Sequence, residues 1–209
     1  MKKFLNNPIF LTAVFSILLF SCNKDEDKLI EEIDNKTIVN FPFCKTGNQW
    51  TYTYSSSSDS EITFNTTVKV TSVDENGWVK IKINMILVEY EAWWYAHDNN
   101  FSDLASPPSH YLYLYKKEAK VGDVYENTFI AKHGRPVTNR NEVVALNQSI
   151  TVIAGTFTGC TKIRKTTSED AVYYADIWFS PEIGIIKDEG TTAKDFPNIG
   201  TSELHSINF

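Results

Sequence analysis

Two acidic residues carry the spacing that catalysis by a carboxylate pair requires. Glu89 and Glu91 are two positions apart, and on a strand this places both on one face with Cβ atoms about 7 Å apart. Such a pair can act as acid and base in glycoside hydrolysis. A solvated strand edge explains the same spacing equally well.

Histidines and acids flank a second candidate position. His97 and His110 bracket a polar stretch that contains Asp98, Asp103 and Pro107-Pro108, and we interpret residues 97–109 as a long loop. A loop that brought these side chains together could bind a metal ion or supply an acid and a base. Two histidines on a loop are more often solvated surface groups, so we predict no catalytic residue, no metal site and no cofactor.

The established catalytic and nucleotide motifs are missing from the sequence. The glycine-containing stretch at residues 155–162 lacks the Gly-Lys-Ser/Thr ending of a phosphate-binding loop. No G-x-S-x-G, H-E-x-x-H or C-x-x-C motif occurs. A hydrolase that uses Glu or His from its loops is therefore our third functional alternative.

Aromatic residues provide the strongest candidate for binding, and they gather on both sides of the predicted loop. Trp93 and Trp94 precede it, and Tyr111, Tyr113 and Tyr115 follow it. In a strand these three tyrosines share one face. We predict that the five residues include the ligand contacts for a glycan or an apolar small molecule; the alternative is that they form core.

Alternating apolar and polar residues predict the elements that would position these side chains. The alternation is clear at residues 50–54, 62–70 and 78–88, and Asn76-Gly77 between two such runs is a hairpin signal. Further strands are predicted at residues 90–96, 110–116, 125–130, 143–153, 158–167, 171–180, 184–188 and 202–209. The fold class is mainly β, with about ten strands in a single strongly curved antiparallel sheet or half-barrel; a two-sheet sandwich is the alternative. Residues 131–141 are predicted as a second long loop.

The N-terminal residues have the layout of a secretory signal. Lys2 and Lys3 precede an apolar run at residues 9–20, which is too short to span a bilayer. Leu19-Phe20-Ser21-Cys22 resembles the lipobox of bacterial lipoproteins, which implies that Cys22 becomes a lipidated N-terminus. We therefore predict a signal peptide at residues 1–22, with membrane attachment through the lipid on Cys22.

The residues after Cys22 predict where the anchored protein faces. Lys24, Asp25 and Glu26 are similar to the export signal of Bacteroidota-type surface lipoproteins, and this similarity implies an outer-membrane protein that faces the cell exterior. The alternative is a protein that faces the periplasm, in which residues 23–40 are simply an acidic, solvated tether. A net charge of −6 argues against nucleic acid as a partner.

Two further cysteines are compatible with this compartment. Cys44 and Cys160 can form a disulfide in an oxidising environment, and we predict this bridge; two buried free thiols are the alternative. Residues 41–209 have the length of one domain.

Short motifs in the domain give a further resemblance. The segments VIAGTF at residues 152–157 and WFSPEIGIIK at residues 178–187 resemble signatures of uncharacterised secreted and lipid-anchored bacterial β proteins, including TapB-like domains. The resemblance implies a curved antiparallel sheet and no known activity. Our sequence-based hypothesis is a lipid-anchored β domain that binds a ligand without catalysis; the alternative is an accessory partner of an outer-membrane complex.

Overall fold

A computed structural model describes residues 41–56, 63–107, 110–130, 134–168, 174–191 and 199–209. All of these belong to one compact unit, Ile38–Phe209. The predicted signal peptide (1–22), the tether (23–40), Cys22 and the Lys24-Asp25-Glu26 motif lie outside the described residues. Within the described part of the chain, no helix is long and apolar enough to cross a membrane.

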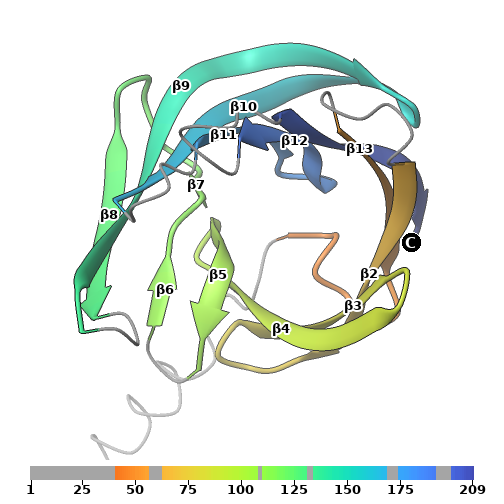
Figure 1. Cartoon of the computed structure of the whole chain (residues 1–209), viewed down its shortest axis with the longest axis horizontal. Coiled ribbons are helices and arrows are strands. Elements are labelled where there is room, and N and C mark those ends of the chain that lie inside the picture. Colours follow the sequence, from red (N-terminus) through yellow and green to blue (C-terminus); the bar gives the residue numbers. More distant parts are fainter. Residues whose placement is uncertain (1–40, 57–62, 108–109, 131–133, 169–173, 192–198) are drawn as a thin grey trace, which may run out of the picture. The chain divides into compact units, whose positions relative to one another are not determined.

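Across the described residues, thirteen strands form one antiparallel sheet, which curves strongly on itself (Figure 1). They are β1 (Gln49–Ser56), β2 (Thr63–Val73), β3 (Trp78–Met85), β4 (Val88–His97), β5 (Asn100–Ser106), β6 (His110–Leu112), β7 (Tyr115–Lys116), β8 (Val124–Ile130), β9 (Pro136–Val152), β10 (Gly155–Thr167), β11 (Tyr174–Ser180), β12 (Gly184–Thr191) and β13 (Ile199–Asn208). The predicted fold class is confirmed, with more strands than the ten expected.

The strands follow one another almost in chain order. The order in space is β6-β5-β4-β3-β2-β1-β13-β12-β11-β10-β9-β8, and β7 pairs with β5. The first and last strands of the chain's domain, β1 and β13, pair at the middle of this order. Its two ends, β6 and β8, come near each other without being paired, and we call this boundary the seam (Figure 1).

The prediction of a long loop at residues 97–109 is wrong, because most of this segment forms strand β5. Asp98 and Asn99 have φ of 50° and 59°, so they form a two-residue turn in which both central residues are left-handed. The chain then returns along β4 in the register His97↔Asn100. Asn and Asp tolerate this backbone region, and without a glycine we mistook the turn for a loop.

Two other predicted boundaries are also wrong. The loop predicted at residues 131–141 contains the start of β9, which begins at Pro136. The strand predicted over residues 78–88 breaks after Met85, because Ile86 has a φ of 31° and turns the chain into β4. This turn consists of apolar residues and contains none of the residues that usually mark a turn. The sequence pattern therefore indicated one continuous strand.

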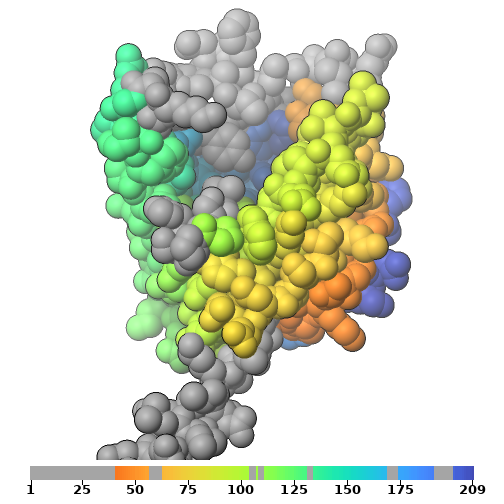
Figure 2. Space-filling model, turned by 90° about the horizontal axis from the view of Figure 1, so that it is seen from below, coloured from red at the N-terminus to blue at the C-terminus, as the bar shows by residue number. Residues whose placement is uncertain are grey.

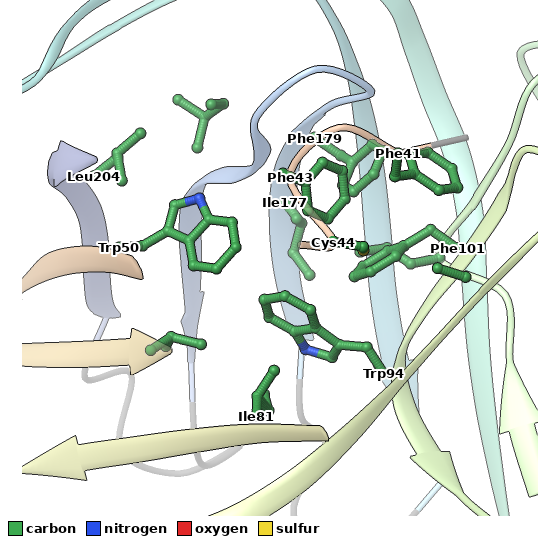
Figure 3. Close-up of a cluster of buried hydrophobic side chains, with 14 of the residues drawn as sticks. Phe41, Phe43, Cys44, Trp50, Ile81, Trp94, Phe101, Ile177, Phe179 and Leu204 are labelled. Carbon is green, nitrogen blue, oxygen red and sulfur yellow. The ribbon is translucent and has the colours of Figure 1, made fainter. Parts of the chain in front are cut away.

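Aromatic side chains fill the concave side of the sheet, and a short N-terminal segment supplies part of them. Residues 41–44 enter this space, where the Phe43 ring lies 5.4–6.3 Å from those of Trp50, Trp94 and Phe101 (Figure 3). Trp50 also donates a hydrogen bond of 2.8 Å from Nε1 to a backbone carbonyl. Each such ring buries roughly 150–250 Å². The segment therefore acts as a plug that completes the core.

The predicted disulfide between Cys44 and Cys160 is absent from the structure, and this is a second correction. Both residues are free cysteines, both are buried, and both belong to the main apolar core. Burial raises the pKa of each thiol, so each side chain remains protonated and packs as a small apolar group. The alternative of two buried free thiols describes the structure.

Candidate functional site

The structure separates the five predicted ligand-binding aromatics into core and surface groups. Trp94 is 7% exposed and lies in the core, 5.4 Å from the ring of Trp50. Tyr115 packs against the same core and stacks on Phe179 at 4.9 Å. These two positions correspond to the core alternative.

Tyr111 and Tyr113 belong to a different group, on the outer side of β3, β4 and β6. We call it the outer tyrosine cluster: Trp78, Tyr95, His97, Tyr111 and Tyr113. The Tyr95 and Tyr111 rings are stacked with centroids 4.3 Å apart, and the His97 ring stacks on that of Tyr95 at 6.0 Å. Tyr113 tilts against Tyr111 at 5.1 Å. All members except Trp78 are half-buried.

Strand alternation explains why this cluster lies outside the core. Val79 pairs with Trp94, and both are core residues on the concave side. The preceding pair, Trp78 and Tyr95, must therefore point to the other side of the sheet. Figure 2 shows the molecule from the side on which β3 and β4 run, in yellow to yellow-green.

The tight turn between β2 and β3, Asp74–Gly77, also contacts β4. Ala96 donates a backbone hydrogen bond of 2.8 Å to Gly77, and an added Cβ at Gly77 would lie 2.5 Å from the Ala96 carbonyl oxygen. Asp74 accepts a 2.8 Å hydrogen bond from the Trp78 backbone amide. The Asp74–Gly77 turn thus fixes Trp78 at the edge of the cluster.

The pKa values of two hydroxyls in the cluster, those of Tyr95 and Tyr113, are raised, which keeps both groups neutral. Burial raises the pKa of Tyr95, and Tyr111, Asp98 and Asp74 raise it further. The pKa of Tyr113 is raised by burial, by a hydrogen bond with Tyr111 and by nearby negative charge. Neutral phenols both donate and accept hydrogen bonds, so the cluster presents apolar ring edges together with polar hydroxyls.

Trp93 lies on the same outer side but is covered by a lysine. The Nζ of Lys80 is 5.9 Å from the centre of the Trp93 ring, within cation–π range. Lys80 also forms an ion pair of 2.7 Å with Glu91. Trp93 is half-buried and is not part of the outer tyrosine cluster.

The acidic residues considered for catalysis are held in ion pairs. Glu91 pairs with Lys80, and Glu89 pairs with Lys82 at 2.7 Å. Asp103 pairs with Lys165 at 2.7 Å. A lysine thus balances the charge of each carboxylate. This argues that the cross-strand ion pairs of Glu89 and Glu91 have a structural role.

Of the two histidine candidates, only the His97 side chain is described by the structure. His97 Nδ1 lies 2.8 Å from Asp98, and the backbone of His110 pairs with Ser106, while the His110 side chain is outside what the structure describes. No group of three or more His, Cys, Asp or Glu residues among the described positions is arranged to hold a metal ion.

A polar cluster at the seam has no counterpart in our sequence analysis. The Nζ of Lys116 lies 4.7 Å from the ring centres of both Tyr113 and Tyr125. Asn141 donates a 2.8 Å hydrogen bond from Nδ2 to the Tyr113 carbonyl. These contacts join the β6–β7 segment to β8 and β9, so side chains connect the sheet ends that backbone pairing does not.

The seam also contains unsatisfied polar atoms. Among the described residues, the buried atoms without a hydrogen-bond partner are Asp103 Oδ1, Tyr125 OH, Asn127 Oδ1 and Asn141 Oδ1. Ordered water commonly satisfies such groups. Residues 125 and 127 lie on one face of β8, and residue 141 pairs with residue 125 from β9. Our sequence analysis placed residue 141 in a loop, so it did not predict this group.

Asp188 on β12 lies near the ion pair of Lys165 and Asp103. Burial raises the pKa of Asp188 to about 6, Lys165 lowers it and Asp103 raises it. The neighbouring Tyr52 has a raised pKa, mainly from burial and in part from Asp188. Asp188 is therefore a carboxyl group that changes charge near neutral pH.

Comparisons with known proteins identify the fold. No family model matches the chain, and no curated protein matches it. A solved structure of a Parabacteroides distasonis protein described as a lipoprotein matches with a TM-score of 0.60 and 17% identity, covering 82% of this chain and 99% of that one. A Bacteroides fragilis protein described as exported, with a YmcC-like fold, matches with a TM-score of 0.55 and 18% identity, covering 82% and 100%. The chain shares its fold with these proteins.

Proposed function

We propose that the protein is a lipid-anchored, exported β domain that binds a glycan at the outer tyrosine cluster, without catalysis. The observation that carries the binding proposal is the row of stacked rings formed by His97, Tyr95 and Tyr111. The core is already filled by other aromatic residues on the opposite side of the sheet. A second aromatic cluster on the outer side is therefore not needed to fill it.

The chemistry of the cluster favours a hydroxyl-rich ligand. Half-exposed ring faces and edges bury the apolar faces of a sugar, at roughly 25 cal/mol per Å². The hydroxyls of Tyr95, Tyr111 and Tyr113 can exchange hydrogen bonds with sugar hydroxyls, because a phenol is both donor and acceptor. A purely apolar ligand would use none of the remaining hydrogen-bonding capacity of these hydroxyls, so a glycan is the better match.

The absence of catalysis is supported by the state of the candidate acids. Glu89, Glu91 and Asp103 each have a lysine within 2.7 Å. Phenols with raised pKa values, such as Tyr95 and Tyr113, are poor bases at neutral pH. These residues can hold a ligand but are badly suited to activate water.

The lipobox-like sequence supports the anchor, and the fold neighbours described as exported and as a lipoprotein agree with it. The outward orientation rests on the motif Lys24-Asp25-Glu26. Cys22→Ala should leave the precursor unprocessed and unlipidated, as measured by mass. Replacement of Lys24, Asp25 and Glu26 by Ala should preserve lipidation but remove protease accessibility on intact cells. A processed Cys22→Ala protein would contradict the anchor, and unchanged protease accessibility would contradict surface export.

The binding proposal is tested on a glycan array that includes bacterial and host polysaccharides. Wild-type protein should bind a defined subset of glycans, and Tyr111→Ala should lose this binding while retaining its folded state by circular dichroism. If the folded wild-type protein binds nothing on the array, or if Tyr111→Ala binds equally well, the outer tyrosine cluster is not a glycan site.

A further inference from the structure

The turn between β3 and β4 exposes an unusual run of apolar side chains, which we call the apolar tip: Ile86, Leu87 and Val88. Their exposed fractions are 72%, 94% and 57%. Tyr90, further along β4, is 44% exposed. Leu87 is thus nearly as accessible as a side chain can be, and its two neighbours are also in water.

The backbone at this turn is not one that these residues favour. Ile86 has a φ of 31°, and a β-branched residue with positive φ is a clear outlier. Elsewhere the chain uses residues suited to turns, such as Asn76-Gly77 and Asp98-Asn99. Local strain combined with exposed apolar groups indicates that the side chains at the tip serve an interaction.

Behind the apolar tip, the charged residues are matched in pairs. Lys82 pairs with Glu89 and Lys80 with Glu91, each at 2.7 Å. The exposed Tyr90 lies between Glu89 and Glu91, so directly behind the apolar tip the hairpin carries an aromatic side chain within a band whose four charged residues are paired. This order resembles that of segments that enter a membrane interface, where aromatic residues lie at headgroup level.

We propose that the apolar tip inserts into the lipid surface to which the protein is anchored. This inference rests on the proposed lipid on Cys22. Residues 23–40 are 18 positions, and a chain of this length spans at most about 60 Å. The anchor thus holds the domain at high local concentration beside the bilayer, where even a weak apolar contact is populated.

The charge of the chain indicates what kind of lipid contact this is. A net charge of −6 disfavours attraction to anionic headgroups, so insertion depends on apolar burial. Vesicles of neutral phosphatidylcholine should therefore be sufficient. A protein partner at the tip would instead require a component other than lipid.

The experiment places an environment-sensitive fluorophore at the tip. Leu87→Cys is labelled with a nitrobenzoxadiazole dye in the lipidated, full mature protein and reconstituted into phosphatidylcholine vesicles. Asn76→Cys, in the exposed turn at the opposite end of β3, is the matched control. Cys44 and Cys160 are buried. Protein without an introduced cysteine is treated with the same dye, to measure any labelling of these two thiols.

If the apolar tip inserts, the emission of the dye at position 87 should shift to the blue and should be reduced by quenchers carried on the lipids. The dye at position 76 should show neither effect. Equal, water-like emission at both positions on vesicle-bound protein would overturn the proposal. A blue shift in native outer-membrane preparations but not in pure lipid would also overturn it, in favour of a protein partner. Lipidation of Cys22 is scored separately by mass, so a failed anchor is distinguished from a tip that does not insert.

Discussion

Lys165 Nζ lies 2.7 Å from Asp103 Oδ2, and this ion pair joins β10 to β5, two strands that are not neighbours in the sheet. Each side chain is only 12% exposed. Together with the hydrogen bond from Asn141 to the Tyr113 carbonyl, it bridges segments close to the two ends of the sheet. The curvature is thus supported by side chains at the place where the backbone ladder stops.

Breaking one half of this ion pair should be costly. Lys165→Met leaves the Asp103 carboxylate buried without its partner, and we expect a loss of about 3–5 kcal/mol in the free energy of unfolding. The double variant Lys165→Met, Asp103→Asn removes both charges and should recover much of that loss. Urea unfolding measures both, and a double variant whose loss equals the sum of the single losses would contradict a direct interaction.

Asp188 gives a prediction about pH. Its pKa is raised from 3.8 to about 6 in the folded state, mainly by burial, so the folded protein binds this proton more tightly than the unfolded chain. Stability from this group is therefore greatest below about pH 4 and declines as the pH rises to about 6. Asp188→Asn should stabilise the protein by about 1–3 kcal/mol at pH 7 and have no such effect near pH 4. Equal effects at both pH values would refute the assignment.

The two buried thiols should be chemically silent in the folded protein. Because burial raises the pKa of Cys44 and Cys160, few thiolates are available to react. A maleimide reagent should label neither in native, purified domain and both after denaturation without reductant. Failure of both to label under denaturing, unreduced conditions would show that they are bridged.

Gly77 should be less tolerant of a side chain than other glycines with positive φ. At Gly77 an added Cβ would meet the Ala96 carbonyl oxygen at 2.5 Å, whereas at Gly122 nothing lies within 4 Å. Both positions have positive φ, at 85° and 93°, so Gly122→Ala should cost about 1–2 kcal/mol from the backbone alone. Gly77→Ala should cost clearly more, because Trp78 and β4 must also shift. Thermal unfolding of the two variants compares the two losses of stability, and equal losses would contradict the prediction.

Much of the fold followed from sequence periodicity, and the errors have specific causes. Alternation of the kind seen at Trp50, Tyr52 and Tyr54 reports a half-buried strand directly. The turns at Asp98-Asn99 and at Ile86 were missed because neither contains the glycine or proline that marks most turns. One of them hid β5 inside a predicted loop, and the other made two strands look like one.

The candidate site was predictable only in part. Periodicity places Tyr111 and Tyr113 near each other, but it cannot tell which face of a strand meets the core. Trp94 and Tyr115 packed inward, whereas Tyr95, which we had not singled out, became the centre of the outer tyrosine cluster. The seam depends on contacts between residues far apart in the chain, such as Asn141 and Tyr113, and no local pattern reports those.

The most direct test of glycan binding is calorimetric titration of the best glycan from the array into wild-type protein, Tyr111→Ala and Tyr54→Ala. Tyr54 is the matched control, because it is also half-buried and stacks on an aromatic ring, that of Phe64 at 4.8 Å, away from the cluster. We predict that Tyr111→Ala weakens binding about tenfold or more, about 1.4 kcal/mol per factor of ten, while Tyr54→Ala leaves the affinity unchanged. Equal affinities for all three proteins, or a loss confined to Tyr54→Ala, would contradict binding at the outer tyrosine cluster.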